Sequence, residues 1–340
     1  MSLPAAPGQG SRHLAVAYAV AAALLASAPF VAGWFAEGRY WLDVLNNVGL
    51  YALLALSLNV ILGDAGLFHM GHAAFYAVGA YTAAILNTQH QVPVLWTLPV
   101  CAAVAALFAL AVARPVVHLR GDYLLIVTIG MGEIVRIALV NDVFGLTGGA
   151  NGITGIDRPS ILGRRIARPQ ELFWLIWGFV ALTVFLFHRL ARSRFGRALN
   201  YLREDEVAAE GSGVPTARYR LMAFALGAAW AGMAGALFAG KARTISPESF
   251  NVGESVKIFA MVILGGAGSI PGVIAGAALL VGIEEGFRGF ANARMLVVGI
   301  AMVAMMAFRP QGLFPVHLPR FRPADLPPPP GAPPREEPGR

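Results

Sequence analysis

The stretch from Lys257 to Gly286 reads KIFAMVILGGAGSIPGVIAGAALLVGIEEG, two apolar runs separated by a segment rich in glycine and ending in proline. The runs, 257–270 and 272–286, are each shorter than the roughly 20 apolar residues that a simple membrane-spanning helix needs. An interruption of this kind indicates a broken helix, which is tolerated in a membrane where the backbone lines a cavity or packs within protein. The stretch therefore predicts an integral membrane protein with interrupted helices.

The composition of the whole chain supports this prediction. Of its 340 residues, 57% are hydrophobic and 13% are charged, whereas a soluble domain is about 45–50% apolar and about 25% charged. So few charges cannot cover the surface of a soluble enzyme, and a disordered chain would be less apolar. The chain has a net charge of +7, which could also indicate a protein that binds nucleic acid. In a membrane protein, however, basic residues mark cytoplasmic loops, so no nucleic-acid partner is expected.

Apolar runs continue along the rest of the chain and predict about ten transmembrane segments, within a range of about eight to eleven. A second interruption, between Gly63 and Gly66, predicts another broken helix. The predicted fold class is therefore an all-α, polytopic integral membrane protein with broken helices. The runs lie at roughly 14–34, 42–62, 67–86, 94–117, 123–140, 172–190, 221–239, 257–270, 272–286 and 295–308.

The first apolar run permits two interpretations. Arg12, the apolar residues that follow and the small residues at 26–28 resemble a signal peptide with its cleavage site. The apolar run continues to Trp34, however, and is then long enough to cross the membrane. A retained helix is the favoured interpretation.

Basic residues predict the orientation in the membrane. The connection 191–220 is the richest in arginine, which places it in the cytoplasm. The C-terminal segment 309–340 carries Arg309, Arg320 and Arg322 and is placed in the cytoplasm for the same reason. Counting back six segments from the connection puts residues 1–13 in the cytoplasm as well. The connection 141–171 then lies outside, despite its four arginines.

The segment after the last apolar run differs in composition from the rest. Residues 14–308 form the predicted transmembrane domain, and nine of the 22 prolines lie between Pro319 and Pro338. A segment so rich in proline cannot hold a helix or a packed core. We expect residues 309–340 to be a disordered cytoplasmic tail.

The stretch after the first interruption contains small residues and two histidines. Gly71 and Gly79 allow two helices to approach closely, because no side chain separates their backbones. His69 and His72 are three apart and are predicted to share a helical face. An imidazole within a membrane needs a partner, so the pair either lines a pathway or forms a hydrogen bond between helices. Two histidines without a nearby carboxylate predict no metal site.

Glu133 and Arg136 are charged residues within a predicted span, three residues apart and therefore on one helix face. A lone charge at the centre of a membrane costs roughly 2.5–3.5 kcal/mol, and pairing lowers that cost. Two interpretations stay open: a structural ion pair, and an element of a pathway or gate.

The arginine-rich connection contains a short acidic stretch at 204–206, which favours a helix N-terminus. Ala208 and Ala209 offer a small, smooth surface, and Gly213 and Pro215 are helix-ending residues. A short helix at 203–214 is predicted. Its shape fits a groove in another protein, although a plain connecting helix explains it equally well.

Two glycine-rich stretches invite comparison with phosphate-binding loops. Residues 235–242, GALFAGKA, nearly match such a loop, but Ala242 replaces the serine or threonine that would bind magnesium. At the second interruption no basic residue is near enough to hold a phosphate. We expect no nucleotide or cofactor on this chain. The second interruption consists of Gly265, Gly266, Gly268 and Pro271, followed by the close-packing residues Gly272 and Gly276.

Six stretches, in the right order between Gly71 and Pro315, together resemble the LivM-type permeases of bacterial ABC importers for branched-chain amino acids, and the resemblance covers the chain from about residue 40 to Pro315. Six such stretches in order are far more specific than any one of them. They are GHAAFYAVGAYTAA, LRGDYLLIVTIGMGEIVRI, LTGGANGITGI, GRALNYLREDEVAAEGSGVPTARYRLMAFALGAAWAGMAGALFA, MVILGGAGSIPGVIAGAAL and FRPQGLFP.

The resemblance implies a permease of the bacterial inner membrane that catalyses no covalent reaction. A second, related permease would complete the pathway, two cytoplasmic ATPase subunits would bind ATP and magnesium, and a periplasmic binding protein would deliver the substrate. Residues 206–213 match the family's coupling loop, which docks on the ATPase. The coupling residues it implies are Arg203, Glu204, Asp205, Glu206, Ala208, Ala209, Glu210 and Gly213.

The substrate and one rival function stay open. His69 stands where relatives usually have a serine, and related permeases carry urea, short amides or other amino acids. A stand-alone, ion-coupled transporter is the rival from another class, with Glu133 or Asp43 as its coupling acid. A membrane enzyme built on His69, His72 and Glu133 is not favoured, because these residues form no recognisable catalytic set.

Overall fold

The structure, a computed structural model, describes residues 38–119, 121–143, 145–161, 164–288, 291–309 and 311–314, together with Ser27 and Pro29. The predictions for residues 1–13 and for the proline-rich tail fall almost entirely outside these residues. The prediction of a retained first helix at 14–34 also lies outside them, apart from those two positions.

Helices make up most of the described chain, in agreement with the predicted all-α class. Four strands of two residues each, which the sequence had not suggested, form two antiparallel pairs in the described connections. They are β1 (Ile153–Thr154) with β4 (Thr244–Ile245), and β2 (Ser160–Ile161) with β3 (Arg164–Arg165). The long helices are α2 (Gly38–Asn59), α3 (His72–His90), α4 (Val94–Val116), α5 (Asp122–Val140), α6 (Pro169–Ala191), α9 (Thr216–Ala242), α10 (Val252–Gly265), α11 (Ile270–Gly286) and α12 (Ala291–Phe308).

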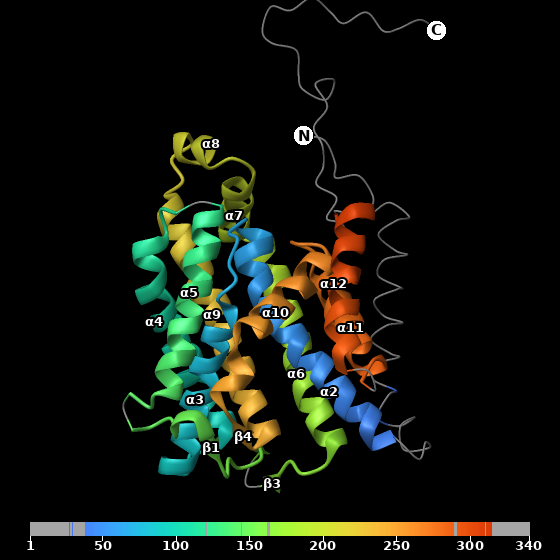
Figure 1. The fold of residues 1–340 in the computed structure, drawn as a ribbon. Coiled ribbons are helices and arrows are strands. Elements are labelled where there is room, and N and C mark those ends of the chain that lie inside the picture. The colour runs from blue at the N-terminus through green and yellow to red at the C-terminus, as the bar shows by residue number, and fades with distance from the viewer. Residues whose placement is uncertain are drawn as a thin grey trace, which may run out of the picture.

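Shorter elements join these helices. A π-helical turn, Val60–Asp64, extends α2, and 3₁₀ turns occur at Gly149–Asn151 and Pro247–Phe250. Two short helices, α7 (Arg194–Glu204) and α8 (Glu206–Gly211), lie at one end of the helical body (Figure 1). The strands β1, β3 and β4 lie at the opposite end, so the two connections predicted to face opposite sides are far apart in space.

Within the described residues, five helices are long and apolar enough to cross a membrane: α2 with its π-helical turn, α4, α5, α6 and α9. Each predicted apolar run in this part of the chain overlaps a helix. The other helices do not meet the requirement for length and hydropathy. A membrane protein with several spans is therefore supported, but the predicted total of about ten segments is not confirmed.

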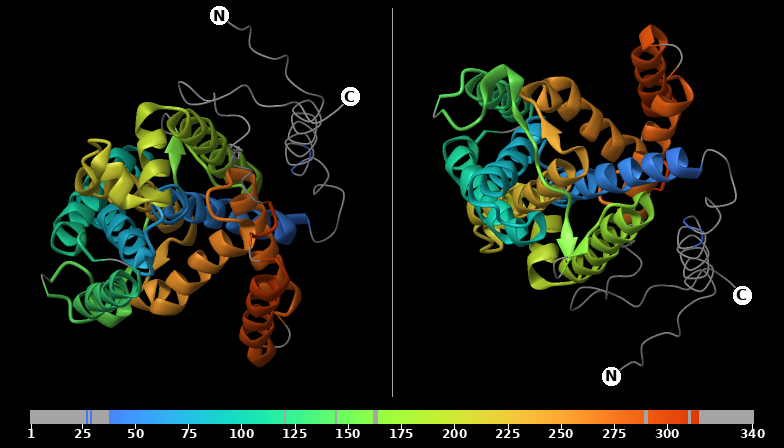
Figure 2. Two further views of the ribbon diagram at one scale, coloured as in Figure 1. Left: turned by 90° about the horizontal axis from the view of Figure 1, so that it is seen from above. Right: turned by 90° about the horizontal axis from the view of Figure 1, so that it is seen from below.

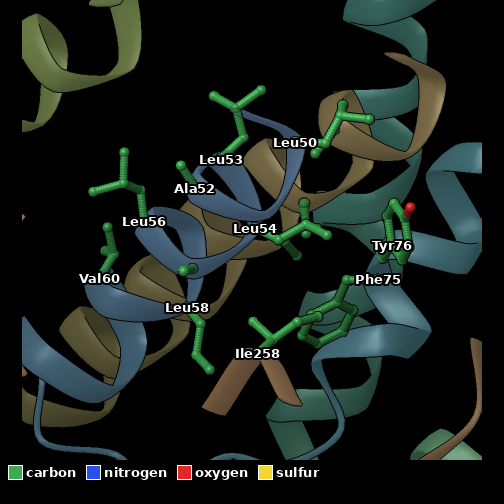
Figure 3. Close-up of a cluster of buried hydrophobic side chains, with 14 of the residues drawn as sticks. Leu50, Ala52, Leu53, Leu54, Leu56, Leu58, Val60, Phe75, Tyr76 and Ile258 are labelled. Carbon is green, nitrogen blue, oxygen red and sulfur yellow. The ribbon is translucent and has the colours of Figure 1, made fainter. Parts of the chain in front are cut away.

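Helix α2 forms the centre of the fold. It runs between α6 on one side and α10 on the other, as the views along the body show (Figure 2). From Leu50 to Val60 its side chains are buried almost all round, which explains why this run carries no polar face. Phe75, Tyr76 and Ile258 bring α3 and α10 against it (Figure 3).

Glycine sets how closely α3 and α9 approach. A Cβ atom on Gly79 would lie 2.2 Å from the Cα atom of Gly232, and one on Gly235 would lie 2.3 Å from the carbonyl oxygen of Tyr76. Gly71 meets the backbone of α5 in the same way, 2.2 Å from the carbonyl oxygen of Thr128. Without side chains at these positions the helix backbones touch, as in other membrane proteins.

Candidate functional site

The two short helices at one end of the body are separated at Asp205. This side chain accepts hydrogen bonds from the backbone N–H groups of Val207 (2.9 Å) and Ala208 (3.0 Å) and so caps α8. A single helix over 203–214 is therefore the wrong prediction, because Arg203 and Glu204 end α7 and α8 begins only at Glu206. The helix start that the acidic stretch predicted is real, and the cap at Asp205 is its physical basis.

Helix α8 has an anchored face and a free face. Val207 is 70% exposed and Ala208 is also exposed, whereas Ala209 is buried against the body. Gly213, just after the helix, has φ of +81°, a conformation that glycine adopts without strain. The exposed face carries no side chain larger than valine at these positions, which leaves a small, smooth surface.

Two contacts fasten α8 to α9. The Arg220 guanidinium lies 2.7 Å from the Glu206 carboxylate and donates a hydrogen bond to the Val117 carbonyl oxygen (2.9 Å), just beyond the end of α4. Arg220 is only 7% exposed. Thr216 donates a second bond, from its hydroxyl to the Glu210 carboxylate (2.6 Å). Glu206 therefore faces the protein body, whereas Glu210 is exposed but bonded to Thr216, and the two contacts together hold α8 in place.

Interrupted segments from three parts of the chain meet near α7. We call this meeting point, formed by residues 59–66, 264–269 and 311–314, the break junction. The Gly268 N–H donates to the Asn59 side-chain oxygen (2.8 Å), and the Leu313 N–H donates to the Leu264 carbonyl oxygen (2.9 Å). These bonds satisfy backbone groups that the helix interruptions leave without helical partners.

Arg203 connects α7 to the break junction. Its guanidinium donates to the Gly63 carbonyl oxygen at 2.6 Å, and its side chain packs over Gly66, which has φ of +69°. The second interruption also contains glycines with positive φ. Gly266 and Gly268 have φ of +110° and +89°, Ser269 caps α11, and Pro271 lies in the first turn.

Helices α10 and α11, which lie on either side of the second interruption, form a hairpin that packs as tightly as α3 and α9 do. A Cβ atom on Gly265 would lie 2.2 Å from the Gly272 carbonyl oxygen, and one on Gly276 would lie 2.2 Å from the Met261 carbonyl oxygen. The backbones of α10 and α11 therefore touch along this hairpin, which fixes its geometry next to the break junction.

His69 and His72 are both buried, but they do not share a helix. The prediction of a common helical face is wrong, because α3 begins at His72 and His69 lies in the preceding connection. The His72 Nε2 atom lies 2.7 Å from the Ser57 hydroxyl, which joins α3 to α2. His69 packs between the Phe75 and Phe224 rings. Among the described residues, no group of three metal-ligating side chains includes either histidine.

Glu133 and Arg136 form an ion pair on α5, with the Arg136 Nε atom 2.9 Å from the carboxylate. Arg136 also contacts Glu248, in the 3₁₀ turn before α10, at 2.8 Å. The sequence spacing predicted the first contact and could not predict the second. Exchanging Glu133 and Arg136 would place a carboxylate opposite Glu248, so an exchange experiment has to change all three residues.

Asp142 lies at the start of the connection 141–171, just after the end of α5. Its carboxylate accepts hydrogen bonds from the Thr147 backbone N–H (2.7 Å) and hydroxyl (2.8 Å). These bonds stabilise the charged form, the backbone bond most, and hold the pKa of Asp142 below its ordinary value. Their stabilising contribution is present at neutral pH and is lost as the pH falls through that lowered pKa.

The near match to a phosphate loop lies at 235–242, within the continuous helix α9. A phosphate-binding loop of that type stands between a strand and the start of a helix. These residues are instead the last turns of a helix, and Gly235 is used for packing against Tyr76.

A polar cavity of about 210 Å³, which no motif of the sequence predicts, lies among α2, α3, α9 and α11. Tyr51, Glu284 and Arg288 line it. Lys257, on α10, lies behind Tyr51 and Glu284, with its Nζ atom 2.5 Å from the Tyr51 hydroxyl and 3.5 Å from the Glu284 carboxylate. Two features of the sequence could have indicated these charged residues: the chain has only two lysines, and Glu284 lies in an apolar run.

Comparison with known proteins agrees with this arrangement. The family model described as "Branched-chain amino acid transport system / permease component" matches residues 40–306, from the start of α2 almost to the end of α12. The chain belongs to this permease family. The match includes α7, α8 and the polar cavity, and it confirms the resemblance seen in the sequence.

Individual relatives carry the same description. The chain is 40% identical to the high-affinity branched-chain amino acid transport system permease protein LivM of Escherichia coli, over 86% of this chain and 74% of that protein. It is 29% identical to LivH of the same species, over 72% and 84%, and 28% identical to BraD of Pseudomonas aeruginosa, over 77% and 91%. No solved structure matches.

Proposed function

We propose that this chain is the transmembrane permease subunit of an ATP-driven ABC importer for branched-chain or other hydrophobic amino acids in the bacterial inner membrane. It forms the translocation pathway with a second, related permease. Two cytoplasmic ATPase subunits bind ATP and magnesium, and a periplasmic binding protein delivers the substrate. The chain itself makes and breaks no covalent bond. Family membership and the names of the relatives support the permease role.

The ATP-driven part of the proposal is supported by the way in which α8 is attached to the rest of the chain. Its exposed face at Val207 and Ala208 stands at one end of the body (Figure 1), and the buried pair of Glu206 with Arg220 ties its other face to α9. A small helix whose outer face is exposed and whose inner face is bonded to α9 is suited to dock onto a partner that moves it.

The same contacts supply a route for that movement. Arg220 joins α8 to the end of α4, and Arg203 joins α7 to the break junction. A displacement of α7 and α8 by the ATPases would therefore reach both a spanning helix and the interrupted segments. ATP can drive alternating access only by binding one of the two states more tightly, so α8 has to sit differently in each state.

The proposal is tested by co-purification and by the energy source of uptake. Mild-detergent extraction from native membranes is expected to recover two ATPase polypeptides and a second permease, identified by mass spectrometry. Leucine uptake in intact cells is expected to stop when ATP is depleted and to survive a protonophore that leaves ATP in place. A chain that purifies alone and transports in vesicles without ATP would contradict the proposal.

The stand-alone alternative needs an acid that is free to bind an ion. Both acids considered for it have cationic partners: Glu133 pairs with Arg136, and Asp43 lies 3.0 Å from the Lys241 Nζ atom. The alternative predicts the opposite result, with uptake abolished by the protonophore at constant ATP. Urea, short amides and other amino acids remain candidate substrates, and competition with labelled leucine ranks them.

The Val207→Arg substitution tests α8 as the docking surface. The residue is 70% exposed, so a longer, charged side chain is accommodated by this chain on its own, but it would obstruct an apolar contact with a partner. We expect normal membrane levels, weakened recovery of the ATPase subunits and uptake reduced about tenfold, equivalent to about 1.4 kcal/mol. Tyr201→Arg, at a position on α7 that is 59% exposed and lies outside α8, is the control. Unchanged uptake and ATPase recovery in Val207→Arg would show that α8 does not dock.

A further inference from the structure

The polar cavity has the size and position of a solute site. Its volume is about 210 Å³, whereas a single water molecule needs only about 10–15 Å³. Phe238, in the last turns of α9, lines it. Because α9 begins just after α8, the cavity lies toward the end of α9 that is remote from the proposed ATPase contact (Figure 1).

The charges beside the cavity do not balance. The Lys257 Nζ atom lies 3.1 Å from the Glu254 carboxylate and 3.5 Å from the Glu284 carboxylate, so one cation serves two anions. The three side chains are only 16%, 17% and 21% exposed. A nearly buried charge without a counter-ion is unfavourable, and this cluster has one net negative charge. A cationic group placed beside Glu284 would give this second carboxylate a counter-ion of its own.

The other charged groups that line the cavity, or lie next to its lining residue Asn47, are paired. The Arg288 guanidinium lies 3.4 Å from the Glu285 carboxylate, and Lys241 pairs with Asp43. The negative charge is therefore local to the side occupied by Glu284. The Arg288 side chain, which also lines the cavity, is 70% exposed and so has room for a further acceptor.

The cavity also has an apolar wall. Leu54 on α2 and Val281 on α11 both line it, and both are buried in the protein interior. Glu284 lies near the C-terminal end of α11 and Arg288 two residues beyond that end, and both line the cavity, so an anionic and a cationic side chain border the same space. An aliphatic α-amino acid has the complementary arrangement, since its ammonium and carboxylate groups are joined through one carbon and its side chain is apolar.

We propose that the polar cavity binds a zwitterionic aliphatic α-amino acid on its way through this chain, with the ammonium group at Glu284, the carboxylate at Arg288 and the side chain against Leu54 and Val281. This inference rests on the proposed function, since it places the substrate of the importer within this permease. The ammonium group gives the Glu284 carboxylate a counter-ion besides the Lys257 that it shares with Glu254, and Arg288 holds the substrate carboxylate. The amino acid carries no net charge, so each of its charged ends meets an opposite charge and the total charge of the site is unchanged.

Direct binding to the complete complex of permeases and ATPases, purified without the binding protein, tests the site. Labelled leucine is displaced by unlabelled leucine, by 4-methylpentanoate, which lacks the ammonium group, and by 3-methylbutylamine, which lacks the carboxylate. Wild-type complex is expected to prefer leucine over both analogues by at least tenfold. In Glu284→Gln, leucine should bind at least tenfold more weakly and the preference over 4-methylpentanoate should disappear.

Two further variants make the test specific. Arg288→Gln should lose the preference over 3-methylbutylamine and keep the preference over 4-methylpentanoate; because Arg288 is largely exposed, this variant carries the test if Glu284→Gln does not assemble. Glu171→Gln is the matched control. It lies on α6, outside the cavity lining, and a glutamine oxygen can still accept the backbone hydrogen bonds that Glu171 accepts.

The outcomes separate this inference from the proposed function. ATP-dependent leucine uptake by wild type, with both variants binding leucine and its analogues like wild type, overturns the site and leaves the importer intact. Absence of saturable leucine binding to the wild-type complex also overturns the site, as does displacement by sodium or potassium chloride at matched ionic strength, which would assign the cavity to an inorganic cation. Loss of ATP-dependent uptake by wild type would contradict the proposed function itself.

Discussion

Replacing Arg220 with glutamine is expected to reduce amino-acid uptake at least tenfold while ATP hydrolysis by the partner subunits continues. Arg220 is 7% exposed and contacts the Glu206 carboxylate and the Val117 carbonyl oxygen together. Removing one partner of a buried ion pair costs about 3–5 kcal/mol, because the other charge is left without a counter-ion. Glu206 lies near the surface and can be partly rehydrated, so we expect about 3 kcal/mol.

A loss of that size lowers the ratio of α8 held against α9 to α8 released from it by more than about a hundredfold. The helix would remain in the chain but would no longer be held against α9, so movement of the ATPases would reach α4 and α9 only weakly. The measurements are uptake, ATPase activity stimulated by the binding protein, and proteolysis in the connection 205–215. We expect cleavage there to increase in the variant.

Arg218→Gln is the matched control, because it removes an arginine from the same first turns of α9 at an exposed position. Arg220→Lys keeps the charge but cannot contact both partners as a guanidinium does, and should be intermediate. If Arg220→Gln transports like Arg218→Gln, the pair with Glu206 has no part in coupling. An equal loss of ATPase recovery and membrane level would instead indicate misfolding.

The structure also changes how the coupling helix should be tested. From the sequence, Glu206 belongs among the residues that meet the ATPase, and replacing it by a basic residue looks like a probe of that contact. In the structure Glu206 faces Arg220 inside this chain. A basic residue there would place two cations together, so the result would report on the internal anchor. Val207 is the residue that reports on the outer surface.

The features that could be predicted from the sequence are those whose cause is local. A glycine-rich segment between apolar runs interrupts a helix wherever it occurs, and the interruption between Gly265 and Pro271 is found where it was expected. Asp205 caps α8 through its own side chain. Glu133 and Arg136 meet because residues three apart on a helix are neighbours. In each case the partner lies within a few residues.

The remaining features depend on packing between distant segments. Lys257 meets Tyr51 only because α10 packs against α2, and no spacing rule relates residues about two hundred positions apart. The same holds for Arg203 and Gly63. The error at His69 has another cause. A spacing of three suggests a helix, but the interrupted segment continues through Gly71 and the helix begins one residue later.

Replacing Gly79 with leucine is expected to prevent stable packing of α3 against α9. A Cβ atom at this position would lie 2.2 Å from both the Cα atom and the carbonyl oxygen of Gly232, and backbone atoms cannot move aside as a flexible side chain can. Overpacking in a dense interior commonly costs about 1–3 kcal/mol. Here the two helices themselves must separate along their contact, so we expect about 4 kcal/mol or more, in the range that is diagnostic of a structural clash.

A size series at two positions distinguishes this clash from a general effect of changing a helical glycine in a membrane. Gly79→Ala should be intermediate in membrane level and in the thermal midpoint of the detergent-solubilised complex, and Gly79→Leu should leave little folded protein. Gly130 on α5 is the control, since no described atom lies within 4 Å of the place where its Cβ would stand. Gly130→Ala and Gly130→Leu should therefore keep the wild-type midpoint. Equal losses at the two positions would show that the contact of Gly79 with Gly232 is not what limits substitution in α3.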